Sequence, residues 1–112
     1  ENDELSSRTP NSGVALMDGF IGNDTITGSD ADDKRLFGDI GDDTIRGGGG
    51  NGTIDGGGSN DKVYGGDGDD DVTGGDNEDY VAGDGGNDRC DGGEGNNDEV
   101  DRPSCEQVTG IP

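Results

Sequence analysis

Aspartate is the residue type with the clearest chemical use in this chain, because it recurs at one position of a short repeat. Glycine opens a unit every nine residues, with a single step of ten, at Gly19, Gly28, Gly38, Gly47, Gly56, Gly65, Gly74, Gly83 and Gly92. The sixth position holds aspartate, with one extra residue allowed before the last, at Asp24, Asp33, Asp43, Asp61, Asp70, Asp79, Asp88 and Asp98. Gly52 alone breaks this column. Carboxylates are hard oxygen ligands, so the column is a candidate series of metal ligands.

A second column of apolar residues decides between an ordered repeat and a disordered tract. It lies two residues after the aspartates, or one further after an insertion, at Ile26, Leu36, Ile45, Ile54, Val63, Val72, Val81, Cys90 and Val100. In a disordered, solvated tract of glycine and aspartate, a branched aliphatic residue in every unit would have no structural role. In a coil with one inward-facing strand per unit, that residue would be buried, so the pattern favours a stacked β-solenoid.

Composition sets the problem that such a fold has to solve. The 112 residues suffice for one small domain, only 22% are hydrophobic, and the net charge is −21. A chain this polar cannot offset the entropy of ordering its backbone unless the charge is neutralised and the repeats stack in register. The negative charge excludes nucleic acid as a partner, and no apolar stretch approaches the length that spans a bilayer.

The repeats resemble the repeats-in-toxin (RTX) family, whose nonapeptide consensus is GGxGxDxUx with U a large aliphatic residue. The unit GGDGDDDVT at residues 65–73 matches it at every specified position, and the resemblance extends from residue 19 to about 101. It implies an all-β, right-handed parallel β-roll of about nine repeats, two per coil. Each unit would contribute a six-residue turn and a three-residue strand.

The resemblance also implies that calcium ions lie between turns of successive coils, held by the aspartates and by backbone carbonyls. Each ion would join a unit to the next but one. One row of turns would be continuous, through the pairs Asp24–Asp43, Asp43–Asp61, Asp61–Asp79 and Asp79–Asp98. The other row would be interrupted at Gly52, with Asp70–Asp88 as its one complete pair and Asp33 isolated. We expect about four or five well-formed sites, up to about seven, and folding coupled to calcium binding.

Both ends of the repeat array need covers. Residues 1–18 are predicted to form an N-terminal arm and cap, in which Val14, Leu16 and Met17 cover the first coil; residues 19–101 form the roll. Cys90 and Cys105 are predicted to form a disulfide, in preference to a zinc or catalytic site, since the chain has no histidine. Residues 102–112 would then be a C-terminal cap, and closing this loop of about fifteen residues is worth about 3 kcal/mol.

Other functional interpretations are weaker. Paired carboxylates such as Asp69 and Asp70 suggest acid–base catalysis, but they lie on the repeat lattice, and no reaction class can be assembled without histidine or an activated nucleophile. We therefore expect that the chain is not an enzyme. Asn23 and Asn51 fit the N-glycosylation pattern but lie within repeats. Ice binding is disfavoured because the residues flanking the inward column vary between coils.

The function must then come from the roll. The chain starts at Glu1 without a methionine or a signal-peptide region, which suggests a processed chain or an excised segment. We expect a secreted, extracellular structural protein, at a bacterial cell surface or in a matrix, whose copies dock head to tail into a filament. The alternative is a C-terminal folding and secretion module of a larger secreted enzyme or toxin.

Overall fold

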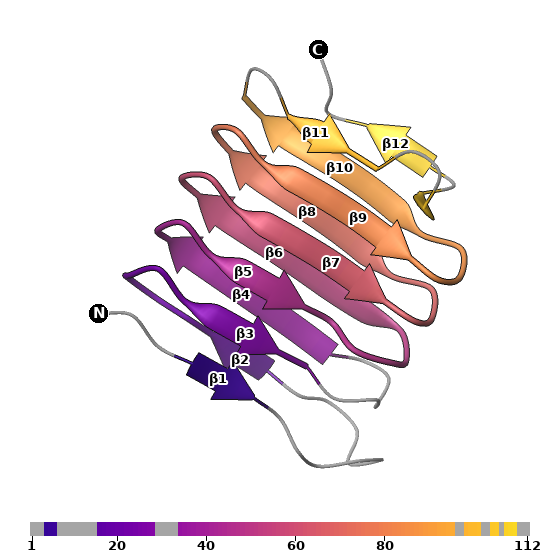
Figure 1. Ribbon diagram of the computed structural model, residues 1–112, viewed down its shortest axis with the longest axis horizontal. Helices are drawn as coiled ribbons and strands as arrows, with labels where there is room; N and C mark the ends of the chain where they lie inside the picture. Colours follow the sequence, from indigo (N-terminus) through magenta and orange to yellow (C-terminus); the bar gives the residue numbers. More distant parts are fainter. Residues whose placement is uncertain are drawn as a thin grey trace.

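The computed structural model describes residues 4–6, 16–28, 34–95, 98–101, 104–105 and 107–109, and these form two parallel β-sheets (Figure 1). The six strands of sheet A follow the order β1-β3-β5-β7-β9-β11, and those of sheet B follow the order β2-β4-β6-β8-β10-β12. Strands of the two sheets alternate along the chain, so each coil contributes one strand to each sheet. The predicted parallel β-roll is confirmed.

The strands are short, as expected from nine-residue units. Sheet A comprises β1 (Glu4–Ser6), β3 (Thr25–Thr27), β5 (Thr44–Arg46), β7 (Lys62–Gly66), β9 (Tyr80–Asp84) and β11 (Glu99–Val100). Sheet B comprises β2 (Leu16–Asp18), β4 (Lys34–Ile40), β6 (Gly52–Gly58), β8 (Asp71–Asp76), β10 (Arg89–Glu94) and β12 (Gln107–Thr109). None of the described residues forms a helix long and apolar enough to cross a membrane.

The register of the strands follows the repeat. Ile45 pairs with Val63, and Val63 with Val81, so a coil advances by two units of nine residues. The ten-residue unit does not disturb this alignment, because Ile26 still pairs with Ile45. The extra residue is therefore taken up outside the paired strands, and the apolar column stays on the inner side of both sheets.

That column forms most of the core, to which Ala82 and Cys105 also belong. Its members are completely buried in every coil of the repeat array except the last, namely Ile26, Leu36, Ile45, Ile54, Val63, Val72, Val81 and Cys90. Met17, Val100 and Val108 pack against them from the two ends. One branched side chain per unit is a thin core, so burial of apolar surface alone gives this chain little of the free energy that its backbone requires.

Several strands continue beyond the predicted three residues into the glycines of the next unit. In β6 and β8 they include Gly57 and Gly75, whose φ angles are 104° and 111°. A Cβ atom built on Gly75 would lie 2.0 Å from the carbonyl oxygen of Gly57 in the preceding coil. Glycine is needed here for the positive φ and for the close approach of the coils. Phe20 and Asp39 adopt a positive φ at the equivalent position, which is uncommon for residues with side chains.

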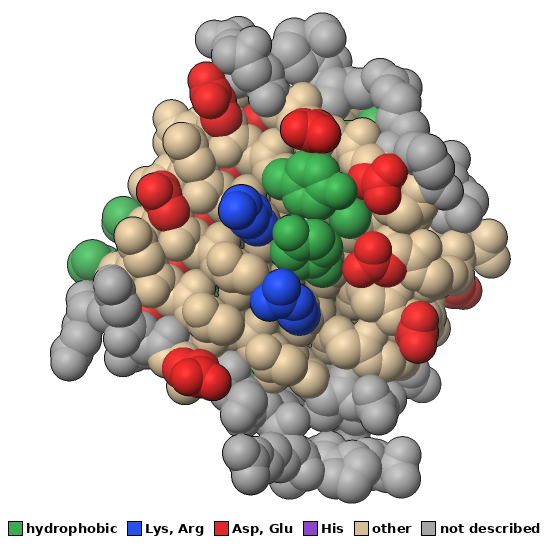
Figure 2. Space-filling view, viewed as in Figure 1, with side chains coloured by type: hydrophobic (Ala, Val, Ile, Leu, Met, Phe, Trp, Pro, Cys, Tyr) green, Lys and Arg blue, Asp and Glu red, His purple; other side chains and the backbone are tan. Residues whose placement is uncertain are grey.

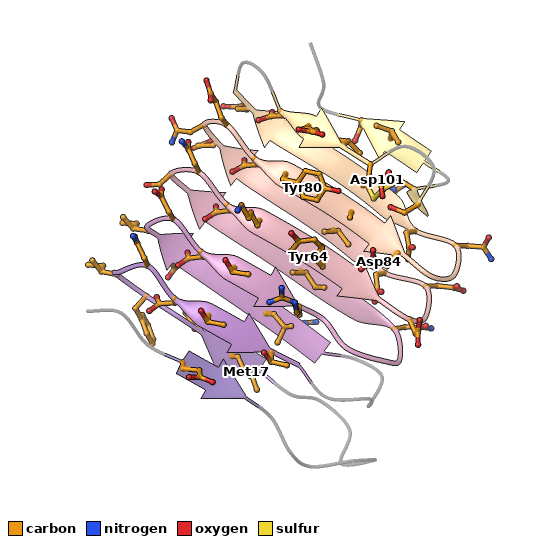
Figure 3. All side chains as sticks on the ribbon, viewed as in Figure 1. Met17, Tyr64, Tyr80, Asp84 and Asp101 are labelled. Atoms are coloured by element: carbon orange, nitrogen blue, oxygen red, sulfur yellow. A yellow bond between two sulfur atoms is a disulfide. The ribbon has the colours of Figure 1, made fainter. Side chains whose placement is uncertain are left out.

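The outer face of sheet A carries both tyrosines of the chain, Tyr64 and Tyr80 (Figures 2 and 3). The rings of Tyr64 and Tyr80, on neighbouring strands, have centroids 5.7 Å apart, and the Arg46 guanidinium lies 5.2 Å from the Tyr64 centroid. These contacts join β5, β7 and β9 across the stack and add to their backbone pairing. The face is irregular from coil to coil, in agreement with the sequence-based argument against ice binding.

The N-terminal flank contributes strands where the sequence predicted an extended arm. Glu4–Ser6 pairs in parallel with β3, and Leu16–Asp18 pairs with β4, so both sheets continue one strand beyond the repeats. Met17 packs on the core as expected. Val14 and the side chain of Leu16 lie outside what the structure describes.

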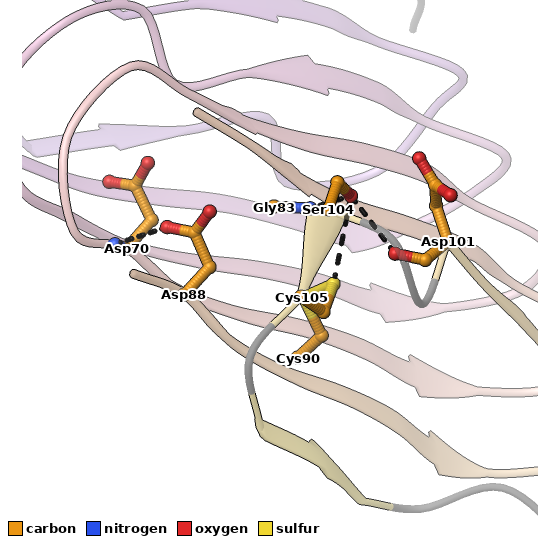
Figure 4. The surroundings of a disulfide bond; sticks show 7 residues. All are labelled: Asp70, Gly83, Asp88, Cys90, Asp101, Ser104 and Cys105. Atoms are coloured by element: carbon orange, nitrogen blue, oxygen red, sulfur yellow. Dashed lines mark hydrogen bonds between the residues drawn. A yellow bond between two sulfur atoms is a disulfide. The ribbon is translucent and has the colours of Figure 1, made fainter. Parts of the chain in front are cut away.

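The C-terminal flank is attached through the predicted disulfide. Cys90 and Cys105, which are 15 positions apart in sequence, are bonded, with Cα atoms 5.9 Å apart (Figure 4). Cys90 occupies the inward column and is fully buried. The residues after the bond form β12, which pairs with β10 at the edge of sheet B. The tail therefore extends the solenoid, and the disulfide limits how far this edge can separate from it.

Candidate metal sites

The sixth-position aspartates lie in two rows of turns on opposite edges of the sandwich. The row that leads from sheet B to sheet A holds Asp24, Asp43, Asp61, Asp79 and Asp98, each directly before a strand. The opposite row holds Asp70 and Asp88, while Asp33 lies outside the described residues. Except for Asp98, these side chains are only 1–3% exposed. The structure thus gathers the predicted ligands into the two predicted rows.

From Asp43 onward, one carboxylate oxygen of each described sixth-position aspartate accepts a hydrogen bond from the preceding coil. The N–H of Asp43 donates to Oδ1 of Asp61 at 2.8 Å, and the N–H of Asp61 donates to Oδ1 of Asp79 at 2.8 Å. At the two ends of the row, the N–H of Asp24 donates to Oδ1 of Asp43 at 2.7 Å, and the N–H of Asp79 donates to Oδ1 of Asp98 at 3.0 Å. Asp70 Oδ1 likewise accepts from Gly52, and Asp88 Oδ1 from Asp70. The predicted pairs are therefore in contact, through one side chain and one backbone group.

The second carboxylate oxygen has a different environment. Oδ2 of Asp43, Asp61, Asp79 and Asp98 is buried and makes no hydrogen bond with any residue that the structure describes. A buried ionised oxygen without a partner is costly, and such groups are normally paired or bound to a metal. Each Oδ2 is accordingly a ligand position suited to a cation.

The first glycine of each unit leaves space beside this oxygen. A Cβ atom built on Gly56 would lie 2.6 Å from Asp61 Oδ2 and 2.5 Å from the carbonyl oxygen of Gly74, in the next coil. On Gly74 it would lie 2.8 Å from Asp79 Oδ2 and 2.6 Å from the carbonyl oxygen of Gly92. The carboxylate and the carbonyl are therefore close enough to bind one ion, and any side chain at these glycines would occupy the space between them.

This set of donors fits calcium. Among the described residues no three His, Cys, Asp or Glu side chains gather around one point, so a bound ion must take further ligands from the backbone. Carboxylate and carbonyl oxygens together are the ligands of calcium, which accepts six to eight of them in flexible geometry. The sulfur and imidazole ligands preferred by zinc are absent from these turns as far as the structure describes them.

Burial opposes ionisation of the same carboxylates. Desolvation raises the pKa of Asp61 from 3.8 to about 8, although the N–H of Asp43 works in the opposite direction. Desolvation also raises the pKa of Asp43 and of Asp79 to about 6, and neighbouring carboxylates add to the effect. Without a cation, the folded row therefore holds negative charge only at a cost in free energy near neutral pH.

Gly52 interrupts the second row without disturbing its backbone. Its N–H donates to Asp70 Oδ1 at 2.7 Å, as the aspartates do in the other row. The φ angle of Gly52 is not positive, so a residue with a side chain is compatible with this conformation. What Gly52 lacks is the carboxylate, so the interruption predicted from the sequence is a missing ligand in an intact turn.

The fifth position of the units also has a role, which the sequence analysis missed. Oδ1 of Asn60 accepts a hydrogen bond from the N–H of Glu78 in the next coil, and Oδ1 of Asp42 accepts from Asn60. In the other row, Oδ1 of Asn51 accepts from Asp69 at 2.8 Å. The fifth position is Asn or Asp in nearly every unit, and that regularity was the available signal. These bonds run toward the next coil, whereas the sixth-position bonds run toward the preceding one.

Parallel coils joined by glycine-rich turns, with a buried aspartate facing a carbonyl in each turn, define a metal-binding β-roll. A family model for the RTX calcium-binding nonapeptide repeat matches the chain in four copies, at residues 18–54, 37–72, 47–81 and 64–98. These copies span more than half of the chain, which therefore belongs to this family and is a calcium-binding RTX β-roll. No curated protein and no solved structure matches the chain.

Replacing Gly52 with aspartate should restore the missing ligand. Gly52→Asp is expected to increase the number of bound calcium ions, by up to about two, because the new carboxylate has a neighbour in the coils on both sides. Isothermal titration calorimetry measures the stoichiometry. Thr53→Asp is the control, since it adds the same charge at an exposed neighbouring position. A stoichiometry equal to that of the wild type would contradict the assignment of this gap.

The raised pKa values predict that protons substitute for calcium. In calcium-depleted buffer, the contribution of these groups to folding is fully present below pH 3.8 and is lost as the pH rises through about 6 for Asp43 and Asp79 and about 8 for Asp61. The β signal in circular dichroism should therefore grow as the pH is lowered from about 8 to about 5. With calcium present, the calcium concentration at the folding midpoint should fall over the same range, because protonation already removes part of the buried charge that opposes folding. A β signal that falls on acidification without calcium would contradict this explanation.

Proposed function

We propose that the chain is an extracellular structural element whose fold is set by calcium. The observation that carries the proposal is the burial of Asp43, Asp61 and Asp79, whose pKa values are raised by desolvation, because their burial makes the folded state costly unless a cation is bound. Extracellular calcium modules typically bind in the sub-millimolar to millimolar range. The chain would then be unfolded in a low-calcium cytosol and become a rigid roll after export.

Two further features support a location outside the cell. The Cys90–Cys105 disulfide is of a kind that persists in oxidising compartments. Five bound calcium ions would cancel about ten of the negative charges, at the turns where the carboxylates lie closest. Outside the cell, calcium is present at the concentration required. There the chain, whose charge prevents aggregation while it is unfolded, would fold into a compact roll.

A structural role is proposed in place of catalysis. One oxygen of Asp61 and of Asp79 accepts a hydrogen bond from the preceding coil, and the described turns bring together no nucleophile and base. Among the described residues, sheets A and B finish at either end of the stack in strands that have a neighbour on one side only, β1 and β2 at one end and β11 and β12 at the other. Such edges can pair with those of another copy, and head-to-tail pairing of this kind propagates into a filament.

The alternative function is a folding and secretion module of a larger secreted protein. The feature that favours it is the disulfide-tied tail, because β12 covers the edge of β10 to which another copy would add a strand. A roll with one covered end serves better as a terminal module than as a repeating unit of a filament.

Calcium removal separates these proposals from each other and from a calcium-independent fold. Titration with EGTA at pH 7.5 should abolish the β signal in circular dichroism, and millimolar calcium should restore it, since unneutralised buried carboxylates oppose folding. Negative-stain electron microscopy of the same samples then shows the assembly. Filaments that appear only with calcium support the structural role.

Monodisperse particles in calcium would exclude self-assembly and leave the module as the better proposal. A β signal unaffected by EGTA would contradict calcium-set folding altogether. Magnesium at equal concentration is the control for charge screening, because it requires near-octahedral geometry and gives up its water reluctantly.

A further inference from the structure

The tail that follows the repeats enters the row of turns interrupted at Gly52. In the repeats of this row, the N–H of the first glycine donates to a backbone carbonyl of the next coil; Gly28 donates to Arg46 and Gly47 to Tyr64. Gly83 has no further repeat beyond it on this side, and its N–H donates to the hydroxyl of Ser104 at 3.1 Å (Figure 4). The hydroxyl of Ser104 thus takes the place of a backbone carbonyl of an absent coil.

Ser104 also supplies the carbonyl that the candidate metal sites require. A Cβ atom built on the first glycine of a unit meets the aspartate Oδ2 of its own unit and the carbonyl oxygen of the first glycine one coil further on. This arrangement recurs at Gly38, Gly56, Gly65 and Gly74. At Gly83 the two oxygens are Asp88 Oδ2, at 2.5 Å, and the carbonyl oxygen of Ser104. The tail reproduces the arrangement with a residue that belongs to no repeat.

Three bonds hold the Ser104 carbonyl in that place. Its hydroxyl accepts from Gly83 and donates to the carbonyl of Asp101 at 3.0 Å, and its own N–H donates to the same carbonyl at 3.0 Å. The next residue, Cys105, is 7% exposed and is bonded to the fully buried Cys90. The side chain of Asp88 is 2% exposed, so its carboxylate faces the protein and not the solvent.

We propose that the disulfide-tethered tail completes a calcium site formed by Asp88 and the carbonyl of Ser104. The repeats alone end this row at the pair Asp70–Asp88, so the tail adds a site that the repeat pattern does not contain. Because Cys105 adjoins Ser104, the site depends on the oxidised disulfide, and calcium binding at this end of the roll is linked to the redox state of the cysteines. The proposal rests on calcium binding by the turns.

Calcium stoichiometry with and without a reductant tests this link. The oxidised chain should bind about one ion more than the chain reduced with a phosphine, both measured by calorimetry at calcium concentrations where circular dichroism shows a complete roll. Asp88→Asn should abolish the difference, because the site is then lost in both redox states. Asp79→Asn, in the other row, is the matched control and should keep the full difference between oxidised and reduced protein.

A second variant leaves the disulfide intact and applies even if reduction unfolds the roll. Ser104→Ala removes the hydroxyl that fixes the carbonyl, and it should weaken one calcium site by several-fold, whereas Thr109→Ala in the same tail should not. Equal stoichiometry in both redox states, a redox difference that survives Asp88→Asn, or unchanged calcium affinities in Ser104→Ala would each overturn the proposal. A wild-type chain that binds no calcium at all would instead refute the function proposed above.

Discussion

The fold depends on the burial of one carboxylate in most of the described turns. The side chain of Asp61 illustrates both consequences of this burial, since Oδ1 accepts the N–H of the preceding coil while Oδ2 makes no hydrogen bond within the described structure. The first interaction orders the stack, and the second makes the stack unstable until a cation arrives. A single side chain therefore provides both the connection between coils and the requirement for calcium, which explains why folding and binding are expected to be one event.

The remaining features follow from this constraint. A core with one branched residue per unit contributes too little apolar burial to fold a chain of net charge −21. Glycine at the first position, as at Gly56, keeps the space between carboxylate and carbonyl open, and glycine at the second, as at Gly57, lets adjacent coils approach. Asparagine at the fifth position, as at Asn60, adds a bond in the opposite direction along the stack. Each of these repeat positions thus meets one structural requirement of coils that are bridged by metal ions.

The repeat period made the architecture predictable from the sequence, because a nine-residue spacing of Asp and Ile or Val has few other physical explanations. The pairing of Asp43 with Asp61 was predicted from the resemblance to the RTX family, which implies two units per coil, and the Cys90–Cys105 bond from the cysteine count. Spacing says nothing about the conformation of non-repeating segments, so the pairing of Glu4–Ser6 and the position of Ser104 were not predicted. The different roles of the two oxygens of one carboxylate also could not be predicted, because they are seen only from atomic positions.

The charge of the buried carboxylates, and not the total charge, should make the fold dependent on calcium. Circular dichroism in EGTA at pH 7.5 of the triple variant Asp43→Asn/Asp61→Asn/Asp79→Asn tests this dependence most directly, because asparagine keeps the Oδ1 acceptor and removes the buried charge. The matched variant Asp67→Asn/Asp76→Asn/Asp84→Asn makes the same change at exposed positions. We expect a β-roll signal without calcium for the first variant and none for the second. Equal signals from the two variants, or an unfolded first variant, would contradict this expectation.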